Sequence, residues 1–338
     1  MASNDLDRPN IDASSRNLAL ELVRVTEAAA LAAARFIGMG DKEAADQAAV
    51  DAMRLVLGSV PMAGVVVIGE GEKDEAPMLY NGEQIGNGEP PEVDIAVDPL
   101  EGTTLTAHGM PSALSVIAMA ERGSMFDPGP CLYMEKIAGA HDIADLLDLD
   151  RPLPETLRLV AERREMDLRD VTVVMLDRPR LKEATREVRD AGARVRLIAD
   201  GDVAGALLAA DEGSPVDLLW GIGGTPEGVI CAAALKSMGG QLVGRLWPRS
   251  DEERRAALDA GYDLEQQLTV DDLITSDDCG FAATGVTDGD ILEGVRYRRA
   301  RGATTESLVM RSRSGTVRRI HATHDREKLS AVTCHIDF

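Results

Sequence analysis

Four acidic side chains stand at the ends of two neighbouring apolar segments. Glu70 and Glu72 follow the first segment, Asp98 closes the second, and Glu101 comes three residues later across Pro99. A run of charges is usually a solvated face, but these carboxylates flank apolar runs. Mg2+ and Mn2+ prefer carboxylate, carbonyl and water ligands. Two hypotheses therefore remain open from spacing alone, a divalent-cation site and an acidic surface turn.

The residues after Asp98 fit the chemistry of phosphate ester hydrolysis. Two ions about 4 Å apart would clamp the attacking water and the leaving oxygen. Gly102 lacks a Cβ and would let a phosphate approach the backbone closely, and the Thr103 hydroxyl could hold or help to deprotonate the water. Bound cations would also supply the positive charge that an acidic protein needs in order to accept a phosphate.

Two further carboxylates are left undecided by spacing. Asp46 falls on the apolar stripe of a predicted helix over 42–57, where it could complement the helix dipole or bind an ion. Glu227 lies in "GIGGTPEG", residues 221–228, and is a further candidate oxygen ligand.

Several other kinds of site are disfavoured. The chain has no G-x-x-x-x-G-K-[ST], H-E-x-x-H or G-x-S-x-G motif. The segment 221–228 replaces the third glycine of a dinucleotide fingerprint with Pro226, which argues against a nicotinamide cofactor. His321 and His324 lie on a predicted strand without a nearby cysteine, and a structural role is the simpler interpretation for both.

The composition sets limits on partners and compartment. The formal charge of −22 argues against nucleic acid or anionic membrane as a partner. Aromatic residues make up 3% and hydrophobic residues 44% of the 338 residues, which predicts an aliphatic core of helices packed on sheet. Four widely spaced cysteines without a C-x-x-C pair and the lack of a signal peptide predict a cytoplasmic protein. No apolar run reaches the roughly 18 residues that span a bilayer.

The first half of the chain reads as helices followed by strands. Helices are predicted over 15–37 and 42–57, the second capped by Asp41, and strands over 65–68, 93–98, 112–120 and 132–138. Residues 146–157 carry two prolines and are predicted to connect two domains.

From Val171 strands and helices alternate, which is typical of a parallel sheet covered by helices. Ligands bind at the carboxyl ends of such strands, and these ends are polar or glycine-rich at 177–180, 200–202 and 221–228. A final strand pair is predicted over 304–324, with Ser314 and Gly315 at its turn. We expect residues 1–155 to form a metal-binding α+β subdomain and 156–338 an α/β substrate-binding subdomain, from which the last strands can return to the N-terminal sheet.

The motifs resemble a known enzyme family. "DPLEGTT" resembles the D-P-I-D-G-T motif of the lithium-sensitive, metal-dependent phosphatases, which include inositol monophosphatases and fructose-1,6-bisphosphatases. The wider set "GDKEAADQAAVDAMR", "VIGEGEKDEAPMLY", "LYMEKIA", "DGDVA", "GIGGTPEGV" and "ATGVTDGDILEGV" is similar to the class II fructose-1,6-bisphosphatases of bacteria, from about residue 17 to 324. The resemblance implies an α/β fold of alternating layers, α-β-α-β-α, in two subdomains with the active site between them.

The resemblance also implies roles for individual residues. It implies two or more Mg2+ or Mn2+ ions held by Asp46, Glu70, Asp98, Glu101 and Glu227. It implies catalytic roles for Thr103, Glu70 and Asp98. It implies substrate contacts from Glu101, Gly102, Thr103, Tyr133, Arg178, Pro179, Arg180, Asp200, Gly201, Asp202 and Gly224. The chain departs from the family at Arg178, where a lysine is common, but a guanidinium can also grip a phosphate with two parallel bonds.

The implied reaction is hydrolysis of the 1-phosphate of fructose 1,6-bisphosphate to fructose 6-phosphate and phosphate, a step of gluconeogenesis. Two alternatives stay open: activity on sedoheptulose 1,7-bisphosphate, alone or in addition, and a catalytically silent, cation-dependent sugar-phosphate sensor. Thr103 is expected to orient the attacking water, and direct attack by its hydroxyl is the alternative. The resemblance further implies a cytoplasmic homo-oligomer, either a dimer or a tetramer.

Overall fold

The structure is a computed structural model that describes residues 18–71, 78–298 and 302–325. Its helices are α1 (Leu18–Ala33), α2 (Lys42–Leu57), α3 (Thr103–His108), α4 (Leu153–Arg163), α5 (Lys182–Ala191), α6 (Asp202–Ala210), α7 (Thr225–Met238), α8 (Asp251–Asp259) and α9 (Val270–Leu273). Its strands are β1 (Ala63–Ile68), β2 (Gln84–Ile85), β3 (Glu92–Glu101), β4 (Leu114–Glu121), β5 (Tyr133–Gly139), β6 (Thr172–Leu176), β7 (Arg194–Ile198), β8 (Leu218–Gly224), β9 (Gln241–Leu246), β10 (Leu268–Thr269), β11 (Cys279–Gly285), β12 (Arg296–Arg298), β13 (Gly302–Arg311) and β14 (Thr316–His324).

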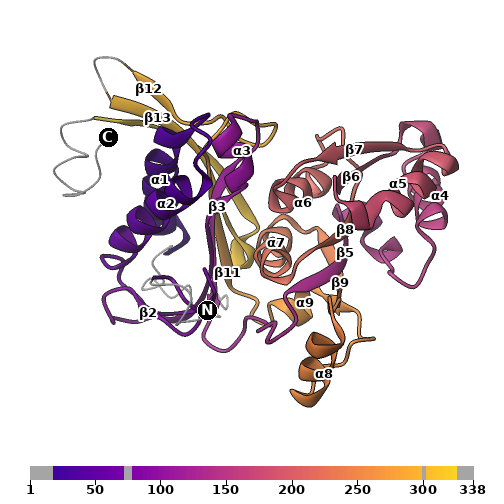
Figure 1. Cartoon of the computed structure of the whole chain (residues 1–338), viewed down its shortest axis with the longest axis horizontal. Coiled ribbons are helices and arrows are strands. Elements are labelled where there is room, and N and C mark those ends of the chain that lie inside the picture. The colour runs from indigo at the N-terminus through magenta and orange to yellow at the C-terminus, as the bar shows by residue number, and fades with distance from the viewer. Residues whose placement is uncertain (1–17, 72–77, 299–301, 326–338) are drawn as a thin grey trace, which may run out of the picture.

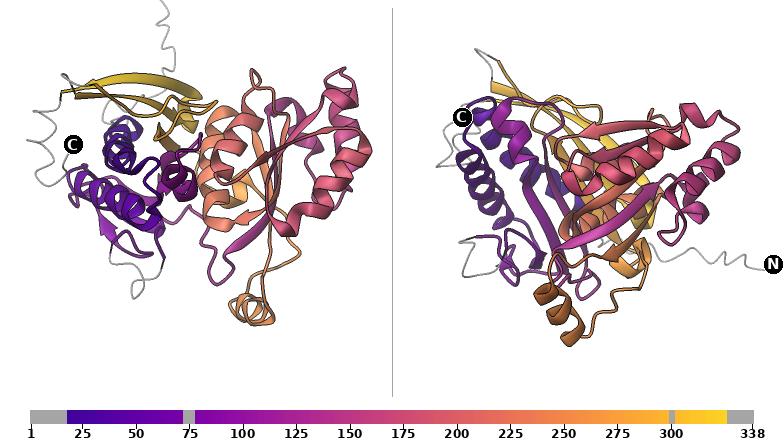
Figure 2. Two further views of the ribbon diagram at one scale, coloured as in Figure 1. Left: turned by 45° about the horizontal axis from the view of Figure 1, so that its top comes forward. Right: turned by 45° about the vertical axis from the view of Figure 1, so that its right-hand side comes forward.

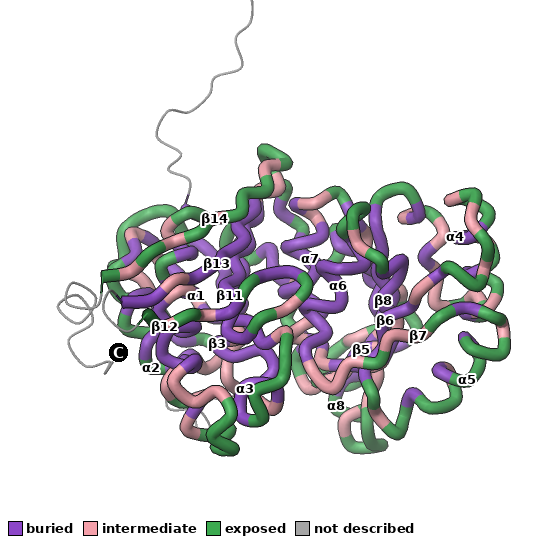
Figure 3. The backbone as a smooth tube through the Cα atoms, turned by 90° about the horizontal axis from the view of Figure 1, so that it is seen from above, coloured by how far each residue is buried: buried purple, intermediate pink, exposed green. Residues whose placement is uncertain are grey.

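These elements form alternating layers, as the resemblance implied. Helices α1 and α2 cover one face of the first sheet, α6 and α7 lie between the two sheets, and α4 and α5 cover the outer face of the second sheet (Figure 1). The central helices explain the aliphatic composition. All nine residues of α6 and most of α7 are buried, because α7 contacts strands of both sheets and α6 packs against α7 and against β5, β6 and β8. Buried backbone therefore runs through the middle of the molecule (Figure 3).

The first sheet holds eight strands among the described residues, in the order β12-β13-β11-β4-β3-β1-β2, with β14 also paired to β13. Strands β1 and β3 are parallel, so their carboxyl ends meet at one edge. The yellow strands after residue 279 lie beside the indigo helices of the N-terminal half (Figure 2). The last strands thus return to the first sheet, an arrangement that the sequence analysis left open.

The second sheet has the order β10-β9-β5-β8-β6-β7 among the described residues. Strands β7, β6 and β8 are parallel, as their alternation with helices predicts. Strand β5 lies between β8 and β9 and is antiparallel to both, so the sheet is mixed and not wholly parallel. Because β5 and β6 belong to the same sheet, residues 146–157 connect two strands of this sheet. The expectation that they join two domains was wrong at this point.

Local sequence signals account for several element boundaries. Asp41 caps α2 as predicted, since its carboxylate accepts a hydrogen bond from the backbone N–H of Ala44 at 3.0 Å. The first helix ends at Ala33 and continues as a short 3-10 turn to Phe36, and its expected start at Ser15 lies outside the described residues. The predicted C-terminal hairpin is confirmed, with Arg311 paired to Thr316 and Gly315 in the left-handed region. Among the described residues, no helix is both long enough and apolar enough to cross a bilayer.

Candidate metal centre and active site

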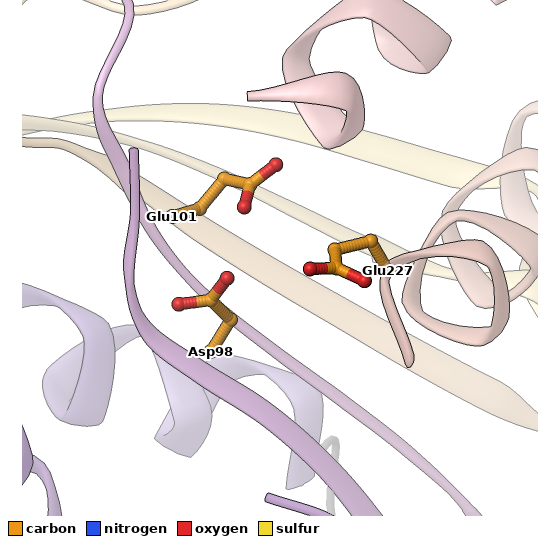
Figure 4. Close-up of side chains that lie close together, drawn as sticks. All are labelled: Asp98, Glu101 and Glu227. Atoms are coloured by element: carbon orange, nitrogen blue, oxygen red, sulfur yellow. The ribbon is translucent and has the colours of Figure 1, made fainter. Parts of the chain in front are cut away.

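Asp98 and Glu101 are brought together by an irregularity within β3. The sequence analysis placed a proline turn after Asp98, but the strand continues through Pro99 to Glu101. The pairing with β4 runs Asp98 to Val116 and then Glu101 to Leu114, so β3 contains one extra residue here. Such a bulge is a place where a strand tolerates proline, which has no N–H to donate. Both carboxylates consequently face the same space (Figure 4).

Gly102 and Thr103 form the corner between β3 and α3. Gly102 has φ of +89°, and a Cβ there would lie 2.9 Å from Cδ1 of Leu105. Only glycine adopts this corner without strain. Thr103 is the first residue of α3, is partly exposed, and lines the same pocket as the carboxylates.

Glu227 completes the cluster from the opposite side, in the first turn of α7. Each of Asp98, Glu101 and Glu227 offers an oxygen atom within 4.8 Å of the others (Figure 4). The Oε2 atom of Glu227 is buried without a hydrogen-bond partner. Burial and then the Asp202 carboxylate raise the pKa of Glu227 to about 7. An unpartnered carboxylate oxygen facing two other carboxylates fits a cation ligand.

The pocket around this cluster has a volume of about 380 Å3. Its lining brings together eight of the site residues named from the sequence: Asp46, Glu70, Asp98, Glu101, Gly102, Thr103, Asp200 and Glu227. Glu70 reaches the pocket because it follows β1, whose carboxyl end meets that of β3. Glu72 lies outside the described residues. The placement predicts that all five expected metal ligands can act in one pocket.

The pocket is strongly electronegative. Burial raises the pKa of Glu70 to about 8, with further increases from the Asp46 and Asp98 carboxylates. Burial also raises the pKa of Asp98 to about 6, although its hydrogen bond with Glu101 opposes the increase. Burial and the charge of Asp98 raise the pKa of Glu101 well above its ordinary value. Burial and neighbouring negative charges thus favour the protonated forms of these carboxyl groups, and a divalent ion would replace their protons.

The expected substrate-binding residues lie at the adjoining ends of β6, β7 and β8. Arg178 pairs with Asp200 at 3.2 Å, which ties its guanidinium to the rim of the metal pocket. Arg180 donates to the carbonyl of Ile222, and its Cζ lies 5.0 Å from the centre of the Tyr133 ring. Arg178, Arg180 and Tyr133 do not line the carboxylate pocket itself. Pro179 begins the short 3-10 turn between the two arginines.

Glycines shape the two turns that carry the remaining residues. Gly201 adopts φ of +84° and precedes α6, so that Asp202 begins the helix. A Cβ on Gly224 would lie 1.7 Å from Oε2 of Glu227. Gly224 therefore leaves the space that the Glu227 carboxylate occupies.

One residue that the sequence analysis did not single out lies behind this cluster. Lys136 on β5 is 1% exposed and its Nζ lies 2.5 Å from Oδ2 of Asp202. Burial lowers the pKa of Lys136, but Asp202 and the other acidic groups nearby, including Glu227, together more than offset this effect, so the pKa is raised. The available signal was a lysine within a strand whose other residues, apart from Glu135, are uncharged, since a buried lysine is rare unless it is paired.

The two histidines near the C-terminus have structural contacts, as expected. His324 Nε2 lies 2.8 Å from the Thr305 hydroxyl, and His321 Nε2 lies 3.3 Å from the Glu306 carboxylate.

Comparison with known proteins gives a consistent result over almost the whole chain. Residues 16–324 match the family described as bacterial fructose-1,6-bisphosphatase, glpX-encoded. A class 2 fructose-1,6-bisphosphatase of Haemophilus influenzae is 44% identical over 323 residues, which cover 92% of this chain and 96% of that protein. Fructose-1,6-bisphosphatase 1 class 2 of Escherichia coli is 44% identical over 322 residues, covering 91% of this chain and 95% of that protein.

Proposed function

The chain belongs to the bacterial, glpX-encoded fructose-1,6-bisphosphatase family, and we propose that the pocket between β3, α3 and α7 is where it acts on its substrate. As a class 2 fructose-1,6-bisphosphatase, it hydrolyses fructose 1,6-bisphosphate to fructose 6-phosphate and phosphate. The observation that carries the assignment of the site is the carboxylate triplet Asp98, Glu101 and Glu227, which lies in one pocket with Thr103.

The donor set fits hard divalent cations. All the candidate ligands are carboxylates, and one of their buried oxygens has no protein partner. We assign Asp98, Glu101 and Glu227 as the central ligands and Asp46 and Glu70 as further ligands of Mg2+ or Mn2+. When bound, such ions supply positive charge to the phosphoryl oxygens and to the attacking water.

The chain's own groups then orient the reactants. The Thr103 hydroxyl, at the start of α3, hydrogen-bonds the attacking water and directs it at the phosphorus of the 1-phosphate. Gly102 keeps the backbone corner open to that phosphate, because it carries no side chain. The carboxylates of Glu70 and Asp98 line the same pocket and accept the proton that the water gives up.

The second phosphate is held away from the reaction. Arg180 has no carboxylate partner among the residues of 18–71, 78–298 and 302–325, and its cationic head lies near the Tyr133 ring. Arg178 and Arg180 grip the 6-phosphate, and Asp200 and Asp202 accept hydrogen bonds from sugar hydroxyls. Binding of the remote phosphate helps to position the reacting one.

One assay panel tests the proposal. Phosphate release is measured with fructose 1,6-bisphosphate, sedoheptulose 1,7-bisphosphate and inositol 1-phosphate, each with Mg2+ and with Mn2+. We expect the fructose substrate to be preferred and turnover to stop on chelation. In Asp98→Asn, turnover should fall by at least about a thousandfold, because a charged ligand is lost. Asp190→Asn, on the exposed face of α5, is the matched control. Asp98→Asn with near wild-type turnover would overturn the site.

The state of the protein in the cell belongs to the same proposal. We propose a homo-oligomer in the cytoplasm, on the basis of the family resemblance and the cysteine pattern. Sedimentation of the purified protein measures the subunit number, and a monomer at enzyme-assay concentrations would contradict the proposal.

A further inference from the structure

A single buried cation stands behind the carboxylate pocket. Among the residues that the structure describes, Lys136 is the only buried lysine or arginine. Its Nζ lies 2.5 Å from Oδ2 of Asp202 and donates a hydrogen bond to the carbonyl oxygen of Gly224 at 3.0 Å. The ammonium group therefore joins three elements: β5, the start of α6 and the end of β8.

The surrounding backbone leaves room for this ion pair. A Cβ on Gly223 would lie 2.3 Å from Oδ2 of Asp202 and 3.3 Å from Nζ of Lys136. A side chain at this position of β8 would displace the carboxylate. The pair thus occupies a space that the fold keeps free of other side chains.

The pair lies next to the expected metal ligands. Val203, the residue after Asp202, donates its backbone N–H to Oε1 of Glu101 at 3.0 Å. The Gly224 carbonyl that accepts from Lys136 lies three residues before Glu227, at the start of α7. Lys136 therefore contacts Asp202, whose neighbour Val203 holds Glu101, and also contacts the backbone that precedes Glu227.

We propose that Lys136 is a positioning residue of the phosphatase site, which neutralises Asp202 and holds it apart from the metal ligands. This inference rests on the proposed function of the pocket. Because Asp202 is paired, its charge adds less to that of the carboxylates that bind the ions, and the ion pair fixes the orientation of its carboxyl group for contact with the sugar. Without Lys136 the pocket would gain one unpaired negative charge, which attracts cations and repels a sugar bisphosphate.

The charge effect predicts that loss of Lys136 strengthens the binding of Mn2+ and weakens the binding of fructose 1,6-bisphosphate. In Lys136→Met, the Kd for Mn2+, measured by calorimetry on chelator-treated protein without substrate, should fall about tenfold at pH 8. The KM for fructose 1,6-bisphosphate should rise about tenfold in the same variant. If Lys136 had a merely structural role, its loss would weaken the binding of Mn2+ and of the substrate together. Lys236→Met is the matched control, since Lys236 on α7 contacts Asp271 and the Ile274 carbonyl.

A double variant separates charge from folding. Lys136→Met with Asp202→Asn removes both charges, so no unpaired ion is left in the interior. Its Kd for Mn2+ should return to within about twofold of wild type, whereas the KM should stay raised because the Asp202 carboxylate is lost. If Lys136→Met does not purify as a folded protein, the Kd for Mn2+ and the KM of the double variant serve as the test.

The outcomes distinguish this inference from the proposed function. Wild-type protein that binds no Mn2+ and releases no phosphate would overturn both. Wild-type protein that does both, combined with variants whose metal and substrate affinities fall together or do not change, would overturn only the role of Lys136. A Kd for Mn2+ in the double variant that differs from wild type by fivefold or more would also overturn it.

Discussion

Asp98 and Glu101 face the same pocket although they lie three residues apart in one strand. Side chains alternate along a regular strand, so positions i and i+3 point to opposite faces. The extra residue in β3 between Asp98 and Glu101 corrects this alternation. The bulge is therefore the local feature that brings two members of the carboxylate triplet together, and the third, Glu227, comes from the second half of the chain.

The unpaired oxygen of Glu227 predicts a gain in stability when its charge is removed. Because the pKa of Glu227 is raised to about 7, the folded protein is destabilised by its ionisation at pH 8 in the absence of metal. In chelator-treated protein, Glu227→Gln should raise the free energy of unfolding by about 1–3 kcal/mol at pH 8, while Mn2+ binding is lost. Urea denaturation measures the first effect and calorimetry the second.

The control for this prediction is Glu187→Gln, an exposed change on α5. A Glu227→Gln protein that is less stable than wild type without metal, or that still binds Mn2+ as wild type does, would contradict the role of this carboxylate as a ligand.

The corner at Gly102 predicts a loss of both stability and activity in Gly102→Ala. The substitution forces alanine into φ of +89° and places its Cβ against Leu105. We expect a loss of about 1–3 kcal/mol in the free energy of unfolding and a lower kcat, because Thr103 moves with the corner. Gly123→Ala is the matched control, since Gly123 has φ of +78° but open space around it. Equal losses in the two variants would show that the close contact has no effect.

A pH dependence of stability is predicted at Glu27, which lies on α1 and accepts a hydrogen bond from the Thr305 hydroxyl of β13. Burial raises the pKa of Glu27 to about 6, while the Thr305 hydrogen bond and the Arg24 charge oppose the increase. A raised pKa in the folded state gives stability that is present below the ordinary pKa of 4.5 and is lost as pH rises through 6. Between pH 4.5 and 7 this amounts to about 2 kcal/mol.

Glu27→Gln should remove this contribution, so the variant should gain stability relative to wild type as pH rises from 4.5 to 7. Urea denaturation at both pH values measures the difference. Because His324 Nε2 lies 3.8 Å from Oε1 of Glu27 and its pKa is lowered by burial, the comparison is repeated with His324→Gln in both proteins, which removes the titration of the histidine. A difference between the two proteins that is the same at pH 4.5 and pH 7 would refute the prediction.

Much of the fold follows from local signals in the sequence. The cap at Asp41, the alternation of strands and helices after Val171, and the turn at Gly315 each depend on neighbouring residues, and the structure confirms them. The insertion of β5 between β8 and β9 depends on pairing across about 80 to 110 residues, which no local pattern encodes.

The candidate site shows the same division. The carboxylates at Glu70, Asp98 and Glu101 could be named from their positions at strand ends, because parallel strands end at one edge. The bulge in β3 and the pairing of Lys136 with Asp202 could not be predicted, because each depends on a partner that the fold brings from elsewhere. Glu227 was undecided by spacing and was assigned only through the family resemblance.

The most direct test of the central claim is the anomalous scattering of Mn2+ in crystals of the protein soaked with that ion. The account predicts an anomalous peak among the carboxylates of Asp98, Glu101 and Glu227, about 2.0–2.4 Å from their oxygens. The peak should vanish in Asp98→Asn crystals grown and soaked in the same way. A well-occupied Mn2+ site elsewhere in the molecule, with no peak at this triplet, would contradict the account.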